Sequence, residues 1–293
     1  MKLIKEIIKK KFPNFVMKIK NYKNSKVLNY KIRRGELYDL EVLKNFNLRK
    51  NNHPNPLTKF GKKCYSQTDE DGITLEIVKR MGLKNSYFAE LGVGTGIENN
   101  TLVLSALGWK GFWIGGENLD INLKNSKKLF FIKQWVTRKN VVKLFKDGLS
   151  KINQKNLDLI SLDLDGNDLH LCKELLSNNI CPSIFIVEYN AKFPPPINFT
   201  VEYNSQHEWN RDDYMGASLS SFNKVFEENN YKLICCNAAT GANAFFVKEE
   251  YIHLFPEVPK EIDRIYVEPN YFLPMTYGQH PISIKTINQI VTD

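Results

Sequence analysis

Short apolar runs alternate with segments of helical periodicity throughout the sequence after Tyr65. The apolar runs are YFAELGV, GFWIGG, LFFIKQWV, LDLISLDL and SIFIVEY, and the helical segments include DEDGITLEIVKRMG and NNTLVLSALG. Strands that are apolar along their whole length are typical of parallel sheets with helices on both faces. This alternation therefore predicts an α/β fold built on a parallel sheet.

The pattern changes toward the carboxyl end. ASLSSFNKVFEENN has the period of a helix, and YKLICCNAATGANAFFVKEE predicts two strands joined by a turn that contains Gly and Asn. Together with the five earlier runs, these strands predict a seven-stranded sheet that finishes in an antiparallel hairpin.

The sequence divides into two predicted regions. Residues 1–60 are expected to form a basic helical extension with a polar linker, and residues 61–293 are expected to form one domain. Within that domain, the segment 191–216 is long and lacks periodicity, which is more often true of a functional lid than of a simple connection. For the C-terminal tail, 251–293, capping of the sheet and pairing of subunits are both open.

The net charge of +9 is concentrated at the amino-terminal end. Residues 1–34 carry twelve Lys and Arg against Glu6, so this leader has a charge of +11 and the remainder −2. The near-helical period of its apolar residues suits a lysine-rich helix packed on its own domain, or a peripheral contact of residues 1–26 with an anionic membrane. The slightly acidic body argues against a nucleic-acid partner.

Two features bear on the cellular compartment. No apolar stretch reaches the roughly 18 residues that a membrane span needs, and the amino end lacks the pattern of a secretory signal. The five cysteines form no CxxC pair and no cluster with zinc spacing, so reduced and mostly buried thiols are expected. We therefore expect a cytoplasmic protein, with the inner membrane face as the alternative location.

AELGVGTGIENN, residues 89–100, places three glycines on alternate positions directly after an apolar run. In open α/β sheets, ligands bind beyond the carboxyl ends of the strands, and glycines let the backbone approach them closely. A dinucleotide site prefers the spacing G-x-G-x-x-G, but Ile97 stands where its last glycine would be. Glu90 would repel a diphosphate and attract a cationic ligand, so the loop predicts a site for a positively charged molecule.

The segment E-L-G-V-G-T-G resembles the first motif of class I S-adenosylmethionine-dependent methyltransferases, and the resemblance covers about residues 65–248. It implies a Rossmann-like methyltransferase sheet with S-adenosylmethionine as the cofactor. The acidic residue would interact with the amino acid part of the cofactor, and the glycines would shape the loop around it. The expected cofactor contacts are Gln67, Glu90, Gly92, Gly94, Gly96, Asn100, Glu117 and Asp163.

The second strand departs from the pattern of this family. The family usually has an acidic residue at the end of this strand, where a carboxylate binds both ribose hydroxyls. Here Gly115 takes that position, so we expect Glu117, two residues later, to bind the ribose. The resemblance also implies an adenine pocket between the third and fourth strands, for which TRKN and FKDG, including Asp147, are the candidates.

Acidic and amide side chains follow the fourth and fifth predicted strands. Asp163 and Asp165 end LDLISLDLD, and Glu188 and Asn190 end IFIVEYN, so all four should meet at one edge of the sheet. Oxygen ligands of this kind suit magnesium, and the spacing is similar to that of metal-dependent O-methyltransferases. That similarity implies Asp163, Glu188 and Asn190 as the metal ligands.

Two other interpretations of the same segment stay open. DLDGND shares part of the spacing of a calcium loop, with Glu174 at the last position, although the glycine is displaced and a strand precedes it. Alternatively, Asp165, Gly166 and Asn167 only turn the chain and Asp163 orients the substrate without a metal. This metal-free interpretation resembles the D-x-[DE]-G segment of FkbM-type methyltransferases.

His207, in the lid segment, is the candidate general base because an imidazole accepts a proton near neutral pH. Asp163 and Asp165 complete the predicted catalytic residues, and a merely solvated or hydrogen-bonded His207 is the alternative. YSQTDEDGI is expected to close the site from the other side through Gln67 and Asp71, unless this segment only starts a helix.

The segments SQTDEDGI, DLDGND, VEYNAKFPP, YMGASL and GANAFFV together resemble bacterial, FkbM-like methyltransferases associated with surface-glycan and polysaccharide clusters. This resemblance implies transfer of a methyl group, by direct displacement, to an oxygen or nitrogen of a small-molecule or glycan acceptor such as a sugar precursor. Two alternatives remain: a protein that binds the cofactor without catalysis, and a nucleic-acid methyltransferase.

Overall fold

The structure is a computed structural model that describes residues 40, 41, 43–270, 284, 287, 288 and 291. The chain forms two compact units, residues 1–45 and 46–293. In the first unit the described residues are helical. The basic leader, and with it the membrane contact predicted for residues 1–26, lies outside the described residues. The boundary predicted after residue 60 falls inside the second unit.

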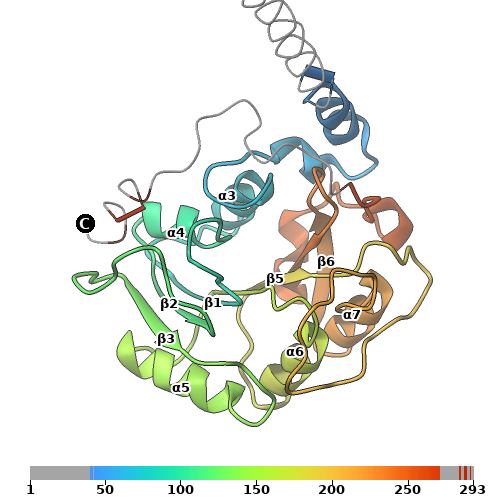
Figure 1. The fold of residues 1–293 in the computed structure, drawn as a ribbon. Coiled ribbons are helices and arrows are strands. Elements are labelled where there is room, and N and C mark those ends of the chain that lie inside the picture. Colours follow the sequence, from blue (N-terminus) through green and yellow to red (C-terminus); the bar gives the residue numbers. More distant parts are fainter. Residues whose placement is uncertain (1–39, 42, 271–283, 285–286, 289–290, 292–293) are drawn as a thin grey trace, which may run out of the picture. The chain divides into compact units, whose positions relative to one another are not determined.

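A seven-stranded sheet forms the centre of the second unit (Figure 1). Its spatial order is β3-β2-β1-β4-β5-β7-β6, with β1 to β5 parallel and β7 antiparallel to both of its neighbours. The Rossmann-like sheet with a terminal antiparallel hairpin, as predicted, is confirmed. The strands are β1 (Tyr87–Leu91), β2 (Lys110–Gly115), β3 (Leu129–Lys133), β4 (Leu159–Leu162), β5 (Ile184–Glu188), β6 (Tyr231–Cys236) and β7 (Asn243–Lys248).

Helices cover both faces of this sheet, as the uniformly apolar strands predict. Apolar residues of α3 and α4 pack in one core cluster, and those of α5, α6 and α7 pack in the other. The helices are α3 (Glu70–Arg80), α4 (Leu102–Ala106), α5 (Val141–Lys151), α6 (Asp168–Ser177) and α7 (Leu219–Glu227). No helix among the described residues is long and apolar enough to cross a membrane.

The segment that leads into the sheet is more ordered than the sequence predicts. Residues 46–52 are helical, and a 3-10 helix, η1 (Pro56–Phe60), follows. The Oδ1 atom of Asn55 accepts the N–H of Leu57 at 3.1 Å, while its Nδ2 donates to the carbonyl of Ile234 at 2.7 Å. Leu57 is buried in the core on the α3 side. Asn55 therefore fixes this helix to the sheet.

The described part of the C-terminal tail packs against the sheet. It contains two 3-10 helices, η2 (Glu249–Leu254) and η3 (Ile262–Arg264). Phe255 is buried in one core cluster, and Ile265 and Val267 are buried in the other. The tail up to residue 270 therefore caps the sheet, one of the two roles that the sequence leaves open.

Candidate functional site

Polar side chains replace apolar ones at the carboxyl ends of β1, β4 and β5. Along these strands, Phe88, Leu159 and Ile186 pack in the core on the α3 and α4 side. Side chains alternate between the two faces of a strand with a period of two. Glu90, Asp163 and Glu188 therefore continue that same face at the edge of the sheet where a ligand would bind.

Gly92 turns the chain directly after β1. Its φ is +80°, and a Cβ built on it would lie 1.5 Å from the carbonyl oxygen of Asp163. The backbone N–H of Asp163 donates to the carbonyl of Leu91 at 3.1 Å, which brings the ends of β1 and β4 together. Only glycine fits this close approach. Gly94 and Gly96 also have positive φ, 47° and 87°.

The buried carboxylate of Glu90 closes the glycine loop. It accepts the backbone N–H of Asn100 at 2.9 Å and that of Thr101 at 3.1 Å, and also the Thr101 hydroxyl at 2.5 Å. The indole N–H of Trp113 donates to the same hydroxyl at 2.9 Å. Burial raises the pKa of Glu90 to about 7, although these hydrogen bonds oppose the shift. Glu90 therefore shapes the loop in addition to lining the cavity beside it.

Two cavities adjoin at the glycine loop and share Gly92, Val93, Gly94 and Asp163. The first, of about 380 Å³, is here called the Asn243 cavity, and its other lining residues include Gln67, Glu90, Glu98, Asn99, Asn100 and Asn243. The second, of about 400 Å³, is called the lid cavity, and its other lining residues include Gly116, Glu117, Trp135, Asp165, His207 and Trp209. Two cavities that meet at one wall can bring two reactants together.

Most of the predicted cofactor residues line one of these cavities. In addition to the shared residues, Gln67, Glu90 and Asn100 line the Asn243 cavity, and Glu117 lines the lid cavity. Glu117 is exposed and lies two residues beyond the end of β2. Gly96 lines neither cavity, and instead packs near Trp113 and Leu119.

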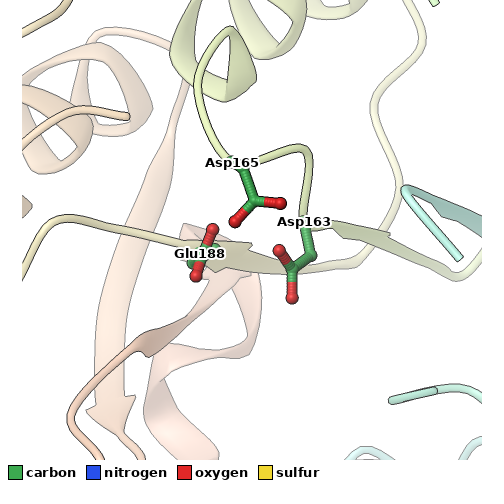
Figure 2. A group of neighbouring side chains, drawn as sticks. All are labelled: Asp163, Asp165 and Glu188. Atoms are coloured by element: carbon green, nitrogen blue, oxygen red, sulfur yellow. The ribbon is translucent and has the colours of Figure 1, made fainter. Parts of the chain in front are cut away.

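Three carboxylates converge at the ends of β4 and β5. Asp163, Asp165 and Glu188 each have an oxygen within 4.8 Å of the others, and Figure 2 shows them facing one another. Burial, followed by the charge of Asp165, raises the pKa of Asp163 to about 8. Burial, followed by the charges of Asp163 and Asp165, holds the pKa of Glu188 well above its ordinary range. The cluster therefore retains a proton at neutral pH or binds a cation.

The side-chain amide of Asn190 is hydrogen-bonded to the backbone of the lid segment. Its Nδ2 donates to the carbonyls of Asp213 and Met215, both at 2.9 Å, and its Oδ1 accepts the N–H of Lys192 at 3.2 Å. The amide therefore holds the end of the lid segment. Asp165, one of the predicted catalytic residues, is the third carboxylate of the cluster.

The segment DLDGND forms the turn from β4 into α6. Asp165 has a φ of +56°, and the carboxylate of Asp168 accepts the N–H of Leu164 at 2.9 Å and that of Gly166 at 3.0 Å. Glu174 lies on α6 and is paired with Arg138 at 3.4 Å. This arrangement contradicts the calcium-loop interpretation and agrees with the simple turn.

The first half of the lid segment is fixed to neighbouring loops. The indole N–H of Trp135 donates to the carbonyl of Ser205 at 2.8 Å, and the amide of Asn167 exchanges two hydrogen bonds with the backbone of Asn204. These contacts bring His207 into the lid cavity, where its Nε2 is buried and has no hydrogen-bond partner among the described residues. The predicted base therefore lines the cavity beside Asp165.

The segments TRKN and FKDG, predicted to form the adenine pocket, are not among the lining residues of either cavity. Trp135 and Val136 line the lid cavity, directly before TRKN. FKDG lies within α5, where Phe145 is buried in the core, so this segment is not a loop. The available signal in the sequence was the aromatic residue Trp135 near the end of the apolar run LFFIKQWV.

The acidic residues around the start of α3 have a structural role. The carboxylate of Asp71 accepts the backbone N–H groups of Cys64, Tyr65 and Ser66, at 2.6 to 2.8 Å. Asp71 is not among the lining residues of either cavity, so it does not make the ligand contact that was expected of it. Gln67, from the same segment, does line the Asn243 cavity.

A buried polar network, which the sequence did not predict, joins this helix to the hairpin. Glu70 accepts a hydrogen bond from the Nδ2 of Asn237 at 3.1 Å and from that of Asn243 at 3.2 Å. Asn243 is opposite Glu188 in the pairing of β5 with β7. The network therefore holds one wall of the Asn243 cavity in place.

The sequence matches no family model and no curated protein sequence. Solved structures with a similar fold include a fibrillarin/Nop5p complex (12% identity, TM-score 0.35, covering 56% of this chain and 72% of that one). A second is a putative hemolysin from Streptococcus thermophilus, with 12% identity and a TM-score of 0.39, covering 79% of this chain and 74% of that one. A third is YjhP from E. coli, with 16% identity and a TM-score of 0.33, covering 61% of this chain and 71% of that one. At these scores the similarity carries no argument about activity.

Proposed function

We propose that this chain is an S-adenosylmethionine-dependent methyltransferase. It transfers the methyl group by direct displacement to an oxygen or nitrogen of a sugar or surface-glycan precursor. The observation that carries the proposal is the pair of cavities that adjoin at the glycine loop and share Gly92, Gly94 and Asp163. This position, beyond the carboxyl ends of the parallel strands, is where open α/β sheets bind ligands.

The chemistry of the two cavities suits a cofactor with a polar and an aromatic end. The lid cavity has the exposed indoles of Trp135 and Trp209 and the carboxylate of Glu117, which suit the adenine and ribose. Carboxylates of the Asn243 cavity, including Glu90, suit the ammonium group of the amino acid end. The sulfonium would then lie near the wall that both cavities share.

In this mechanism the cofactor supplies an already activated methyl group. The protein aligns the acceptor atom with the methyl carbon and sulfur and removes the acceptor's proton. His207 and Asp165, which line the lid cavity, and Asp163, on the shared wall, are the groups available to take that proton. A carboxylate or imidazole in that place would accept it directly or through one water.

The carboxylate cluster also fits a divalent cation such as magnesium. Asp163, Asp165 and Glu188 offer hard oxygen ligands within 4.8 Å of one another, and the Oε2 of Glu188 is buried without a partner in the described part of the chain. These three residues would hold the ion, which would act as a Lewis acid toward an acceptor hydroxyl. A shared proton satisfies the same carboxylates without a metal.

The binding test compares two glycines of similar geometry. Gly94 and Gly82 both have positive φ, and a Cβ on either would meet no atom within 4 Å, but only Gly94 lines the cavities. Gly94→Ala and Gly82→Ala should therefore cost similar stability, about 1–2 kcal/mol. In calorimetry with S-adenosylhomocysteine, Gly94→Ala should weaken binding at least about tenfold, about 1.4 kcal/mol, and Gly82→Ala should not.

Three outcomes separate the proposal from its alternatives. Folded wild-type protein that binds neither S-adenosylmethionine nor S-adenosylhomocysteine would refute the proposal. Cofactor binding without release of S-adenosylhomocysteine, with sugar acceptors of every charge class, would favour a non-catalytic binding protein. Methylation of RNA or DNA in place of sugars would favour the nucleic-acid alternative, as would salt-sensitive binding that survives removal of the basic leader.

A further inference from the structure

The indole of Trp135 joins segments that are distant in the sequence. Its six-membered ring packs against Gly116, just after β2, where a Cβ would lie 3.1 Å from Cε3 and 3.8 Å from Cζ3. At the opposite edge of the indole, Nε1 donates to the carbonyl of Ser205, in the lid segment, at 2.8 Å. Trp135 follows β3 and lines the lid cavity. One side chain therefore contacts both the loop that carries Glu117 and the lid.

The backbone of Trp135 is fixed, but its side chain is not enclosed. The carbonyl of Trp135 accepts the Nδ2 of Asn140 at 2.9 Å, and the Oδ1 of Asn140 accepts the N–H of Thr137 at 2.8 Å. The side chain is 45% exposed, so no surrounding core sets its orientation. The orientation of the indole therefore depends on Gly116, on Ser205 and on what occupies the lid cavity.

The hydrogen bond to Ser205 acts on the turn that carries His207. His207 follows Ser205 by two residues, and its N–H donates to the carbonyl of Asn204 at 3.0 Å. The Nδ2 of Asn167 donates to the same carbonyl at 2.7 Å. Trp135 and Asn167 therefore hold the turn 204–207, and this turn sets where the imidazole lies in the lid cavity.

We infer that Trp135 is a positioning residue that couples cofactor binding to the position of His207. The inference rests on the proposed function, in which the adenine lies against this indole. An adenine stacked on Trp135 restricts the indole to the orientation that packs on Gly116, and in this orientation Nε1 donates to Ser205. Binding that orders the indole therefore also orders the lid turn. The proposed base is held most firmly when the methyl donor is present.

Hydrogen exchange of the full chain, followed by mass spectrometry, measures how firmly the lid turn is held. The reporters are the backbone N–H groups of Asn204, Gln206 and His207, all of which donate hydrogen bonds. In the wild type, saturating S-adenosylhomocysteine should slow their exchange at least about threefold. Trp135→Phe keeps an aromatic face but has no N–H donor. It should still bind S-adenosylhomocysteine, but this ligand should no longer slow the exchange.

Tyr203→Phe is the matched control. The hydroxyl of Tyr203 accepts the backbone N–H of Arg138 at 3.0 Å, so it joins the same part of the lid to the same loop after β3, but Tyr203 lines neither cavity. Without ligand, both variants should speed the exchange of the lid turn by about two- to tenfold, since each loses one hydrogen bond. Only Tyr203→Phe should keep the slowing by S-adenosylhomocysteine. A purely structural role of Trp135 would give the same ligand response in both variants.

Three results would overturn the inference. They are equal slowing by S-adenosylhomocysteine in the wild type and in folded Trp135→Phe, no slowing in wild-type protein that binds this ligand, and equal exchange of the ligand-free wild type and Trp135→Phe. If Trp135→Phe does not fold, Trp135→Leu takes its place with the same expectation. Absence of S-adenosylhomocysteine binding would refute the proposed function, whereas binding without slowing would refute only the coupling.

Discussion

The imidazole of His207 lies directly against Gly166, so that a Cβ built on Gly166 would be 2.0 Å from Cδ2 and 2.4 Å from Nε2 of the ring. The three nearest atoms to that Cβ all belong to His207. The turn after β4 therefore sets the position of the proposed base, and a methyl group at residue 166 must displace it.

Gly166→Ala should cost about 1–3 kcal/mol in the free energy of unfolding, since the new methyl group overpacks the contact with His207. In a His207→Ala background the same substitution should cost less than about 1 kcal/mol, because the clashing atoms are gone. Urea denaturation of the wild type, both single variants and the double variant measures this coupling. Additive costs would contradict the contact.

Gly92 and Gly82 provide a second comparison. Gly92→Ala should destabilise the protein by more than about 4 kcal/mol or prevent folding, because its Cβ would meet the backbone oxygen of Asp163 at 1.5 Å. Gly82→Ala, which meets no atom, should cost only the about 1–2 kcal/mol of a left-handed backbone. Thermal and urea unfolding measure both. Similar losses for the two variants would show that the ends of β1 and β4 are not in this close contact.

The sheet and the glycine loop were predictable because their signals are local. Five uniformly apolar runs specify buried parallel strands, and NAATGAN between two further runs specifies the hairpin. The site was predictable to the extent that strand ends meet at one edge. This rule brings Asp163, Asp165 and Glu188 together, and they do converge.

The rest of the site depends on contacts that are distant in sequence. Asn190 follows β5 as predicted, but lid carbonyls that lie more than twenty residues later compete for its amide. Asn243 lines the cavity that is named after it for two reasons. The register of β7 sets it opposite Glu188, and Glu70 holds its Nδ2. Neither the register nor that partner can be read from local periodicity.

Stability should depend on pH through the buried acids at the start of α3. Burial raises the pKa of Asp69 to about 7 and that of Asp71 to about 6, from an ordinary value of 3.8. Between about pH 4 and about pH 7 the folded state then binds more protons than the unfolded state, so these groups stabilise it most at low pH and lose that contribution as pH rises. The free energy of unfolding should therefore fall over this interval.

Asp71→Asn isolates one part of that pH dependence. The variant loses stability overall, because Asp71 accepts four hydrogen bonds from Cys64, Tyr65 and Ser66. Its unfolding free energy should nevertheless fall less steeply between about pH 4 and about pH 6 than that of the wild type, since one titrating group is removed. Urea denaturation in a series of buffers measures both slopes. Equal slopes would mean that the pKa of Asp71 is the same in the folded and unfolded chain.

A divalent cation should stabilise the folded protein if it binds the carboxylate cluster. Binding to the folded state alone adds about 2.7 kcal/mol at a magnesium concentration of about one hundred times Kd. Asp165→Asn should abolish this gain, whereas Asp212→Asn, on the exposed part of the lid, should retain it. Thermal unfolding with and without magnesium measures the effect. If magnesium has no effect and Glu188→Gln raises the melting temperature, the cluster holds a shared proton instead of a metal ion. The melting temperature would rise because the neutral amide removes the cost of a buried carboxylate beside two others.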